Sequence, residues 1–158
     1  MEAVRPARPG DGPRVEELVA ELLEWVVPQR GGALLLGGAG RPPLAHLGHT
    51  TFGELLADPR RHVLVGTLDS VVTGAAACHV EDRPDGGRWG VLDGCYVEDG
   101  ARGVGLGHLL AAAALAWLRD QGCAGVDGQA LPGDRTAKQF FESAGFKARL
   151  LTMHRAFD

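Results

Sequence analysis

The chain has 158 residues, which is the size of one ordinary domain and enough to bury a sizeable core. Hydrophobic residues make up 45% of it and charged residues 23%, a balance typical of a folded globular protein. The formal net charge of −4 argues against a non-specific nucleic-acid binder, which would carry a basic excess. We therefore expect a single domain over residues 1–158 with no nucleic-acid partner.

The three cysteines, Cys78, Cys95 and Cys123, are odd in number, far apart and in no metal-binding spacing, so a reduced cytoplasmic chain is the simplest interpretation. The first residues lack the apolar core of a signal peptide, and no apolar run approaches the roughly 20 residues that span a bilayer. We expect no membrane partner and no metal. Five histidines also follow no metal-binding spacing: His46, His49, His62, His79 and His154.

The N-terminal half alternates short strands and helices. Residues 3–7 predict a strand, and Asp11 is a plausible N-cap for a helix that Pro28 ends. Residues 31–47 have little periodicity, and their apolar run at 33–36 fits an exposed turn or part of a lid. Thr50 or Thr51 is expected to cap a short helix that ends near Asp58.

The C-terminal half begins with three strands, over residues 62–68, 71–80 and 88–97, joined by tight turns into an antiparallel meander. A helix follows up to Gln121-Gly122, then a strand over residues 124–129 that would run parallel to the strand before the helix. Pro132 and Asp134 open a last helix, and residues 146–157 read as one or two closing strands. The fold class is α+β, or mixed α/β: a mostly antiparallel sheet flanked by helices, with one parallel strand pair.

One stretch indicates a ligand. Val91 to Val97 predict a strand that leads into a loop with glycines at 103, 105 and 107, and then into a helix. The first N–H groups of a helix are unpaired, and glycines let an anionic group approach them. The dinucleotide pattern would need a third glycine at position 108, which is a histidine, and the Walker pattern would need Lys-Ser/Thr after the loop. What fits is R-x-x-G-x-G, with Arg102, Gly105 and Gly107.

That pattern, after a strand that ends in Tyr96-Val97, resembles the acetyl-CoA-binding motif of the GNAT superfamily of N-acetyltransferases. Residues 131–146 resemble the superfamily's second signature, N-x-x-A-x-x-F-Y-x-x-x-G-F. The two motifs cover roughly the C-terminal half of the chain and are far more specific together than either is alone. The resemblance implies transfer of an acetyl group from acetyl-CoA to a primary amine by direct attack. It further implies a cofactor site formed by Cys95, Tyr96, Val97, Arg102, Gly103, Val104, Gly105, Leu106, Gly107, His108, Asp134 and Phe140.

The chain departs from this pattern at three positions. Asp134 replaces the signature's Asn and suits a helix cap. Phe141 replaces the Tyr that often protonates the leaving thiolate, so that role is vacant. Many relatives carry a Glu near position 91; here Asp93, on the same side of the strand, is the candidate base or ammonium anchor. The alternative for Asp93 is a structural carboxylate paired with an Arg.

Other residues leave alternatives open. His79 lies on the strand next to that of Asp93 and could assist as a base, although a structural role is favoured. Trp25 falls where relatives shape the acceptor pocket, but a core position is favoured. A non-catalytic protein that binds or senses acyl-CoA is the rival function. The acceptor, a small molecule or a peptide, cannot be inferred, nor can the length of the acyl group, and a homodimer stays open.

Overall fold

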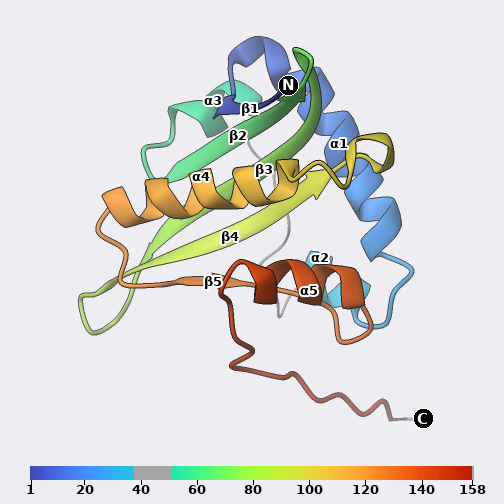
Figure 1. Ribbon diagram of the computed structural model, residues 1–158. Helices are drawn as coiled ribbons and strands as arrows, with labels where there is room; N and C mark the ends of the chain where they lie inside the picture. Colours follow the sequence, from blue (N-terminus) through green and yellow to red (C-terminus); the bar gives the residue numbers. More distant parts are fainter. Residues whose placement is uncertain (38–50, 158) are drawn as a thin grey trace.

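The computed structural model describes residues 1–37 and 51–157. Its centre is one five-stranded sheet with the strands in sequence order, β1-β2-β3-β4-β5 (Figure 1). The strands are β1 (Glu2–Pro6), β2 (Arg61–Leu68), β3 (Val71–Asp82), β4 (Arg88–Val97) and β5 (Val126–Gly128). Neighbours from β1 to β4 are antiparallel, and β4 and β5 are parallel. The mixed sheet with one parallel pair confirms the predicted fold class.

Helices cover both faces of the sheet. Helices α1 (Gly12–Val26) and α3 (Phe52–Ala57) pack on one face, and α4 (Leu106–Asp120) crosses the other (Figure 1). Helix α5 (Arg135–Ser143) follows β5, and the short α2 (Gly32–Gly37) follows α1. Each face has its own apolar core. The α1 face buries Val15, Leu18, Val63, Val65, Ala75 and Ala77, and the α4 face buries Leu64, Ala76, Leu92, Leu106, Leu110 and Leu118.

Small residues in the sheet let α4 lie close to it. A Cβ at Gly66 would stand 2.9 Å from Leu106 Cδ1, and one at Gly90 would stand 2.7 Å from Leu118 Cδ1. Both leucines are almost completely buried, and burying such a side chain contributes about 1.5–3 kcal/mol. The start and the end of α4 are therefore both fixed against the sheet, and with them the glycine loop that precedes the helix.

Local signals at the helix ends mostly act as predicted. Thr51, rather than Thr50, caps α3 in a reciprocal pair with Glu54. Gly122 ends α4 with φ of +80°. Asp11 does occupy the N-cap position of α1, but its side chain makes no cap hydrogen bond there. It binds the Arg5 guanidinium at 2.7 and 2.9 Å instead, and this pair lowers the pKa of Asp11 to about 2.

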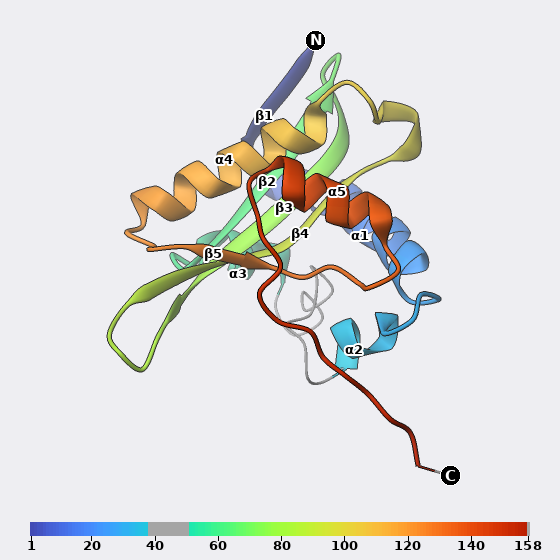
Figure 2. The ribbon, with the colours of Figure 1, turned by 60° about the horizontal axis from the view of Figure 1, so that its bottom comes forward.

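Three segments differ in the structure from what the sequence predicts. The strand expected at 124–129 is only Val126–Gly128, and the apolar run at 33–36 lies in α2, with the rest of the irregular segment, residues 38–47, outside the described residues. The closing strands predicted at 146–157 are wrong: this segment has no secondary structure and leaves the body of the protein (Figures 1 and 2). A strand needs a hydrogen-bonding partner, which alternation in the sequence cannot supply. None of the described helices has the length and apolar character to cross a membrane.

Candidate active site

Strands β4 and β5 separate beyond Leu92, and we call this point the fork. Strand β4 pairs with β5 only from Gly90–Val126 to Leu92–Gly128, so beyond Leu92 its β5-facing edge has no strand partner among the described residues (Figure 2). On its other edge, β3 shifts register at the same place, because Ala77 pairs with Gly94 and the next residue pairs with Leu92. Asp93 is thus the extra residue of a β-bulge at the point where the sheet opens. Bulges are common beside active sites because they redirect a side chain.

The glycine loop lies beyond the open end of β4. Gly103 and Gly105 both have φ of +86°, a conformation that favours glycine, and a Cβ at either would meet no atom within 4 Å. Gly105 is the N-cap of α4, so the N–H groups of the first helical turn have no acceptor within the helix. The loop therefore presents open backbone donors at the positive end of a 15-residue helix.

Arg102 holds this loop against the strand. Its Nε donates to the Val97 carbonyl at 2.8 Å, and its guanidinium lies 5.3 Å from the centre of the Tyr96 ring and pairs with Asp99. The arginine of the motif is thus engaged with the end of β4 in this structure. Its role here is to set the path of the chain from strand to loop, with 42% of the side chain exposed.

The three predicted strand residues alternate about the sheet. Cys95 and Val97 face the α4 core, and the Cys95 thiol lies 3.7 Å from the Gly107 carbonyl. Tyr96 packs on the α1 side, where its hydroxyl donates to Glu21 at 3.1 Å. Burial raises the pKa of the Cys95 thiol to about 12, so the thiol stays protonated at neutral pH. The side chains of these three residues therefore pack within the protein. Only their backbone N–H and C=O groups, along the edge of β4, are left to contact a ligand.

Asp93 and His79 are in direct contact. Nδ1 of His79 lies 2.8 Å from both carboxylate oxygens of Asp93, and Nε2 lies 3.1 Å from Glu81. The side chains of His79 and Asp93 are only 16% and 10% exposed. Both ring nitrogens face carboxylates and must carry hydrogens to donate, a requirement that an imidazolium meets. Burial by itself would lower the pKa of His79, but hydrogen bonds and charge from Asp93 and Glu81 outweigh it and raise that pKa.

Asp134 joins two helices. One carboxylate oxygen caps α5 by accepting from the Ala137 N–H at 2.9 Å, which confirms the predicted cap. The other accepts from the indole N–H of Trp25 at 3.1 Å and from the Gln29 amide at 3.4 Å. The prediction that Trp25 is a core residue is wrong: the indole is held by its polar edge, and the residue is 52% exposed. Asp134 thereby fixes the C-terminal end of α1 to the N-terminal end of α5.

Helix α5 closes the site from the side of β5. Phe140 lies beside α4, where its ring is 3.5 Å from the position of a Cβ at Gly107 and packs edge-on against His108. His108 Nε2 is 2.7 Å from the Ser143 hydroxyl, so this histidine is tied to α5. The Phe141 ring fills the space over Gly128, where a Cβ would come within 2.3 Å of it. Phe141 supplies no proton donor there.

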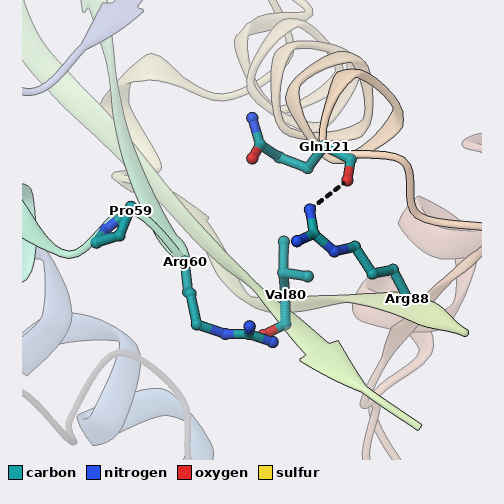
Figure 3. Close-up of a pocket in the computed structure, with 5 residues that line it drawn as sticks. All are labelled: Pro59, Arg60, Val80, Arg88 and Gln121. Carbon is teal, nitrogen blue, oxygen red and sulfur yellow. Dashed lines mark hydrogen bonds between the residues drawn. The ribbon is translucent and has the colours of Figure 1, made fainter. Parts of the chain in front are cut away.

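A small pocket of about 200 Å³ lies elsewhere, at the hairpin end of β3 and β4 (Figure 3). Its arginines serve the fold: Arg60 donates to the Val80 carbonyl at 3.1 Å, and Arg88 to the Gln121 carbonyl at the end of α4 at 2.9 Å. Within residues 1–37 and 51–157, no group of three His, Cys, Asp or Glu is arranged to hold a metal ion. The fork and the loop therefore remain the candidate site.

Comparison with known proteins agrees with this geometry. The Acetyltransferase (GNAT) family model matches residues 19–146. The chain belongs to the GNAT acetyltransferase family. No curated protein sequence matches it.

Several solved structures share the fold at low sequence identity. A mutant of the BH1408 protein from Bacillus halodurans superposes with a TM-score of 0.80 at 20% identity, over 98% of this chain and 99% of that one. The aminoglycoside N-acetyltransferase AAC(6')-Iy in complex with CoA has a TM-score of 0.70 at 16% identity, over 98% and 100%. An aminoglycoside acetyltransferase from an uncultured soil metagenomic sample, in complex with sisomicin, superposes with a TM-score of 0.68 at 18% identity, over 99% of this chain and 95% of that one.

Sequence reasoning missed two carboxylates of the site. Glu81 lies two residues after His79 on β3 and so shares its face, a signal that alternation alone could have given. Glu21 reaches Tyr96 from α1, a contact that depends on how the helix is placed over the sheet. The sequence predicts candidate roles for both Asp93 and His79, and the structure brings them together.

Proposed function

We propose that this protein transfers an acetyl group from acetyl-CoA to a primary amine, with Asp93 as the group that receives the amine. The observation that carries the proposal is the position of Asp93 at the fork of β4 and β5, on the strand that leads into the open glycine loop. Membership of the GNAT family supports acetyl transfer in general.

The chain's backbone fits the cofactor's chemical groups. The open N–H groups of the loop and the first turn of α4 suit a pyrophosphate, since they are unpaired and nothing obstructs Gly103 or Gly105. The free edge of β4 beyond Leu92 suits an extended amide-bearing arm, which would add to the sheet as a strand does. Acetyl-CoA would supply the activated acetyl group. Residues 95–97, 102–108, Asp134 and Phe140 are assigned to its site, the last two as walls.

Asp93 would orient the amine and receive its proton. An ammonium cannot attack, so it has to lose a proton before it becomes nucleophilic, and a carboxylate beside it can hold the ammonium and accept that proton. Asp93 is held in one orientation by His79, which is itself held by Glu81. A proton that reaches this cluster can leave through Glu81, whose side chain is 33% exposed. The carboxylate of Asp93 at the fork favours a cationic acceptor.

Attack is assigned to the amine directly, without an acyl-enzyme. Cys95 is the thiol on β4, and a thiol whose pKa is about 12 is a poor nucleophile at neutral pH. Release of the CoA thiolate would not need a protein acid, since a thiol with an ordinary pKa of about 8.5 is a fair leaving group. Phe141 cannot donate a proton, which is consistent with release of the thiolate without a protein acid.

A non-catalytic acyl-CoA-binding protein is the second candidate. Phe141 in place of a proton donor favours it, as does the engagement of Asp93 with an imidazolium. Measured turnover with a panel of cationic amines separates the two, because a sensor would bind acetyl-CoA and release no free CoA. Aminoglycosides belong in that panel because two structural neighbours are named as aminoglycoside acetyltransferases. We also propose that residues 1–158 act as one domain in the cytoplasm.

A matched pair of glycine variants tests the cofactor site. Gly105 and Gly122 lie at opposite ends of α4, with φ of +86° and +80°, and neither position would crowd an added Cβ. Alanine at either should cost about 1–2 kcal/mol of backbone strain, so both variants should lose similar thermal stability. Only Gly105→Ala should weaken acetyl-CoA binding in a calorimetric titration. Equal binding by the two variants would remove the loop from the cofactor site.

A further inference from the structure

A carboxylate on its own is a weak base for an ammonium group. The ordinary pKa of an aspartic acid side chain is about 3.9 and that of an alkylammonium such as lysine is about 10.4, so the proton transfer is uphill by about six pKa units. A general base is most effective when its pKa lies near the pH at which the enzyme works. The carboxylate that holds the amine in the proposed function therefore needs a stronger base behind it.

His79 is the base that lies behind Asp93. Its Nδ1 is 2.8 Å from both carboxylate oxygens, so a proton on either oxygen is one hydrogen bond away from the ring. An imidazole with an ordinary pKa of about 6.5 is a much stronger base than a carboxylate. Burial by itself would lower the pKa of His79, but the hydrogen bonds and charges of Asp93 and Glu81 outweigh it and raise that pKa. A proton that reaches Asp93 is therefore more stable on Nδ1.

Glu81 determines which ring nitrogen is free to take the proton. A neutral imidazole carries one hydrogen, and its other nitrogen is an acceptor. When an ammonium donates to Asp93, the ring hydrogen is best placed on Nε2, where the Glu81 carboxylate accepts it at 3.1 Å. The bare nitrogen is then Nδ1, which faces Asp93. An imidazolium has no bare nitrogen, so the neutral ring is the active form and acid inactivates it.

Other charged groups on this face of the sheet have partners of their own. By alternation along β3, His79 and Glu81 lie on the face that α1 and α3 cover. The elements packed there contribute further charges, among them Arg61 on β2, Asp58 after α3, Glu54, which caps α3, and Glu21 on α1, which accepts from Tyr96. Arg61 lies opposite His79 and its charge lowers the pKa of His79, but Arg61 pairs with Asp58 at 3.4 Å. The two carboxylates in contact with the ring therefore dominate, and Glu81 is the one that does not hold the amine.

We propose, building on the acetyl transfer proposed above, that the amine's proton passes through Asp93 and comes to rest on Nδ1 of neutral His79, and that Glu81 is a positioning residue that sets the pH range in which His79 can take it. The free amine then attacks: its nitrogen forms a bond to the acetyl carbon, the bond from that carbon to sulfur breaks, and the electron pair leaves with the thiolate. The nitrogen's second proton neutralises that thiolate. One proton per turnover is left on His79, and it leaves by way of Glu81, whose side chain is 33% exposed.

The pH dependence of kcat/KM tests the proposal, measured on the full chain with acetyl-CoA and a cationic amine that the panel shows to be turned over. The wild-type value should fall at acid pH with a midpoint above about 6.5. Glu81→Gln keeps an oxygen that accepts from Nε2 and removes the charge, so its midpoint should lie about half to one pH unit lower. It should therefore be about three- to tenfold more active than the wild type at about pH 5.5, a gain that loss of a merely structural contact would not produce.

Two further variants frame this result. Asp82→Asn removes the same charge from the next position of β3, which points to the opposite face, and its pH profile should follow that of the wild type. His79→Gln removes the base itself, so kcat should fall by about tenfold or more at about pH 8. The titration of the amine is common to all variants, so differences between their profiles belong to the protein.

Nuclear magnetic resonance of histidine-labelled protein measures the titration of His79 without turnover, with its signal assigned from its absence in His79→Gln. The midpoint should be the same in the wild type and Asp82→Asn, and lower in Glu81→Gln by as much as the midpoint of the rate. A His79 signal that Glu81→Gln does not move, or a rate midpoint that stays in place while the signal moves, would overturn this proposal alone. Absence of turnover with every amine, while His79 titrates as expected, would instead remove the acetyl transfer and the proposal with it.

Discussion

Replacement of His79 by glutamine tests the charged cluster at the fork. The variant keeps a polar side chain of similar length but removes the imidazolium that faces two carboxylates. The glutamine amide can still donate to one of the two carboxylates, so the net loss is essentially one hydrogen bond between charged groups, which contributes about 1.5–3 kcal/mol. For a chain of this length, we expect the melting temperature to fall by about 3–12 °C.

The pH dependence gives the sharper test. The pKa of His79 is raised in the folded protein, so the stability that His79 contributes is complete below its unfolded pKa of about 6.5 and is lost as the pH rises through the folded value. The difference in unfolding free energy between wild type and His79→Gln should therefore shrink from acidic to alkaline pH. Urea unfolding at a series of pH values measures it.

His62 supplies the matched control for this experiment. It is the other partly buried histidine of the sheet, stacked on Trp117 with ring centres 4.9 Å apart, and burial lowers its pKa. The stability that His62 contributes has the opposite pH dependence. It is complete above the unfolded pKa of about 6.5 and is lost as the pH falls through the lower folded value. His62→Gln should thus differ from the wild type most at alkaline pH. A His79 effect that is constant with pH, or that follows the His62 trend, would refute the imidazolium assignment.

Three further predictions concern the site. Asp93→Ala should lower turnover of a cationic amine by at least tenfold and leave acetyl-CoA affinity nearly unchanged in calorimetry; an unchanged rate would remove Asp93 from the mechanism. Asp134→Ala should cost about 1–3 kcal/mol in urea unfolding, because α5 loses its cap and Trp25 its partner, and it should shift the tryptophan emission; unaltered emission would contradict the indole contact. Cys95→Ala should retain turnover, since the thiol stays protonated, and mass spectrometry of the wild type should find no acetyl-cysteine.

Much of the fold could be predicted because its signals are local. The turn at Asp69-Ser70, the Thr51 cap and the left-handed Gly122 are each determined by a few neighbouring residues, and each lies where the sequence indicated. The glycine loop is equally local, which is why the motif located it. These features require no knowledge of what packs against them.

The failures have a common physical cause, which is that they depend on a partner distant in sequence. Trp25 has the size of a core residue, yet its position is decided by the carboxylate of Asp134, 109 residues later. The segment 146–157 alternates as a strand should, yet only a neighbouring edge can make it one. Asp11 has the chemistry of a cap, but the guanidinium of Arg5 on β1 provides the stronger partner.

The bulge at Asp93 determines which side chains of β4 face each side of the sheet. Leu92 faces the α4 core, and so do Cys95 and Val97, although Cys95 lies three positions after Leu92, which is an odd spacing. In a regular strand that spacing would place Leu92 and Cys95 on opposite faces. The extra residue absorbs the mismatch, so Asp93 turns toward His79 while the rest of β4 keeps its alternation.

The same irregularity therefore does two things. It places a carboxylate where β5 departs, and it sets which side of β4 faces the helix that follows the glycine loop. A one-residue change of register would turn every later side chain of β4 to the other face and bring Tyr96 into the α4 core. Because the catalytic candidate and the packing of β4 share one backbone feature, a change in the length of β4 at this point should disable both at once, whereas substitution of Asp93 should leave the packing of β4 against α4 unchanged.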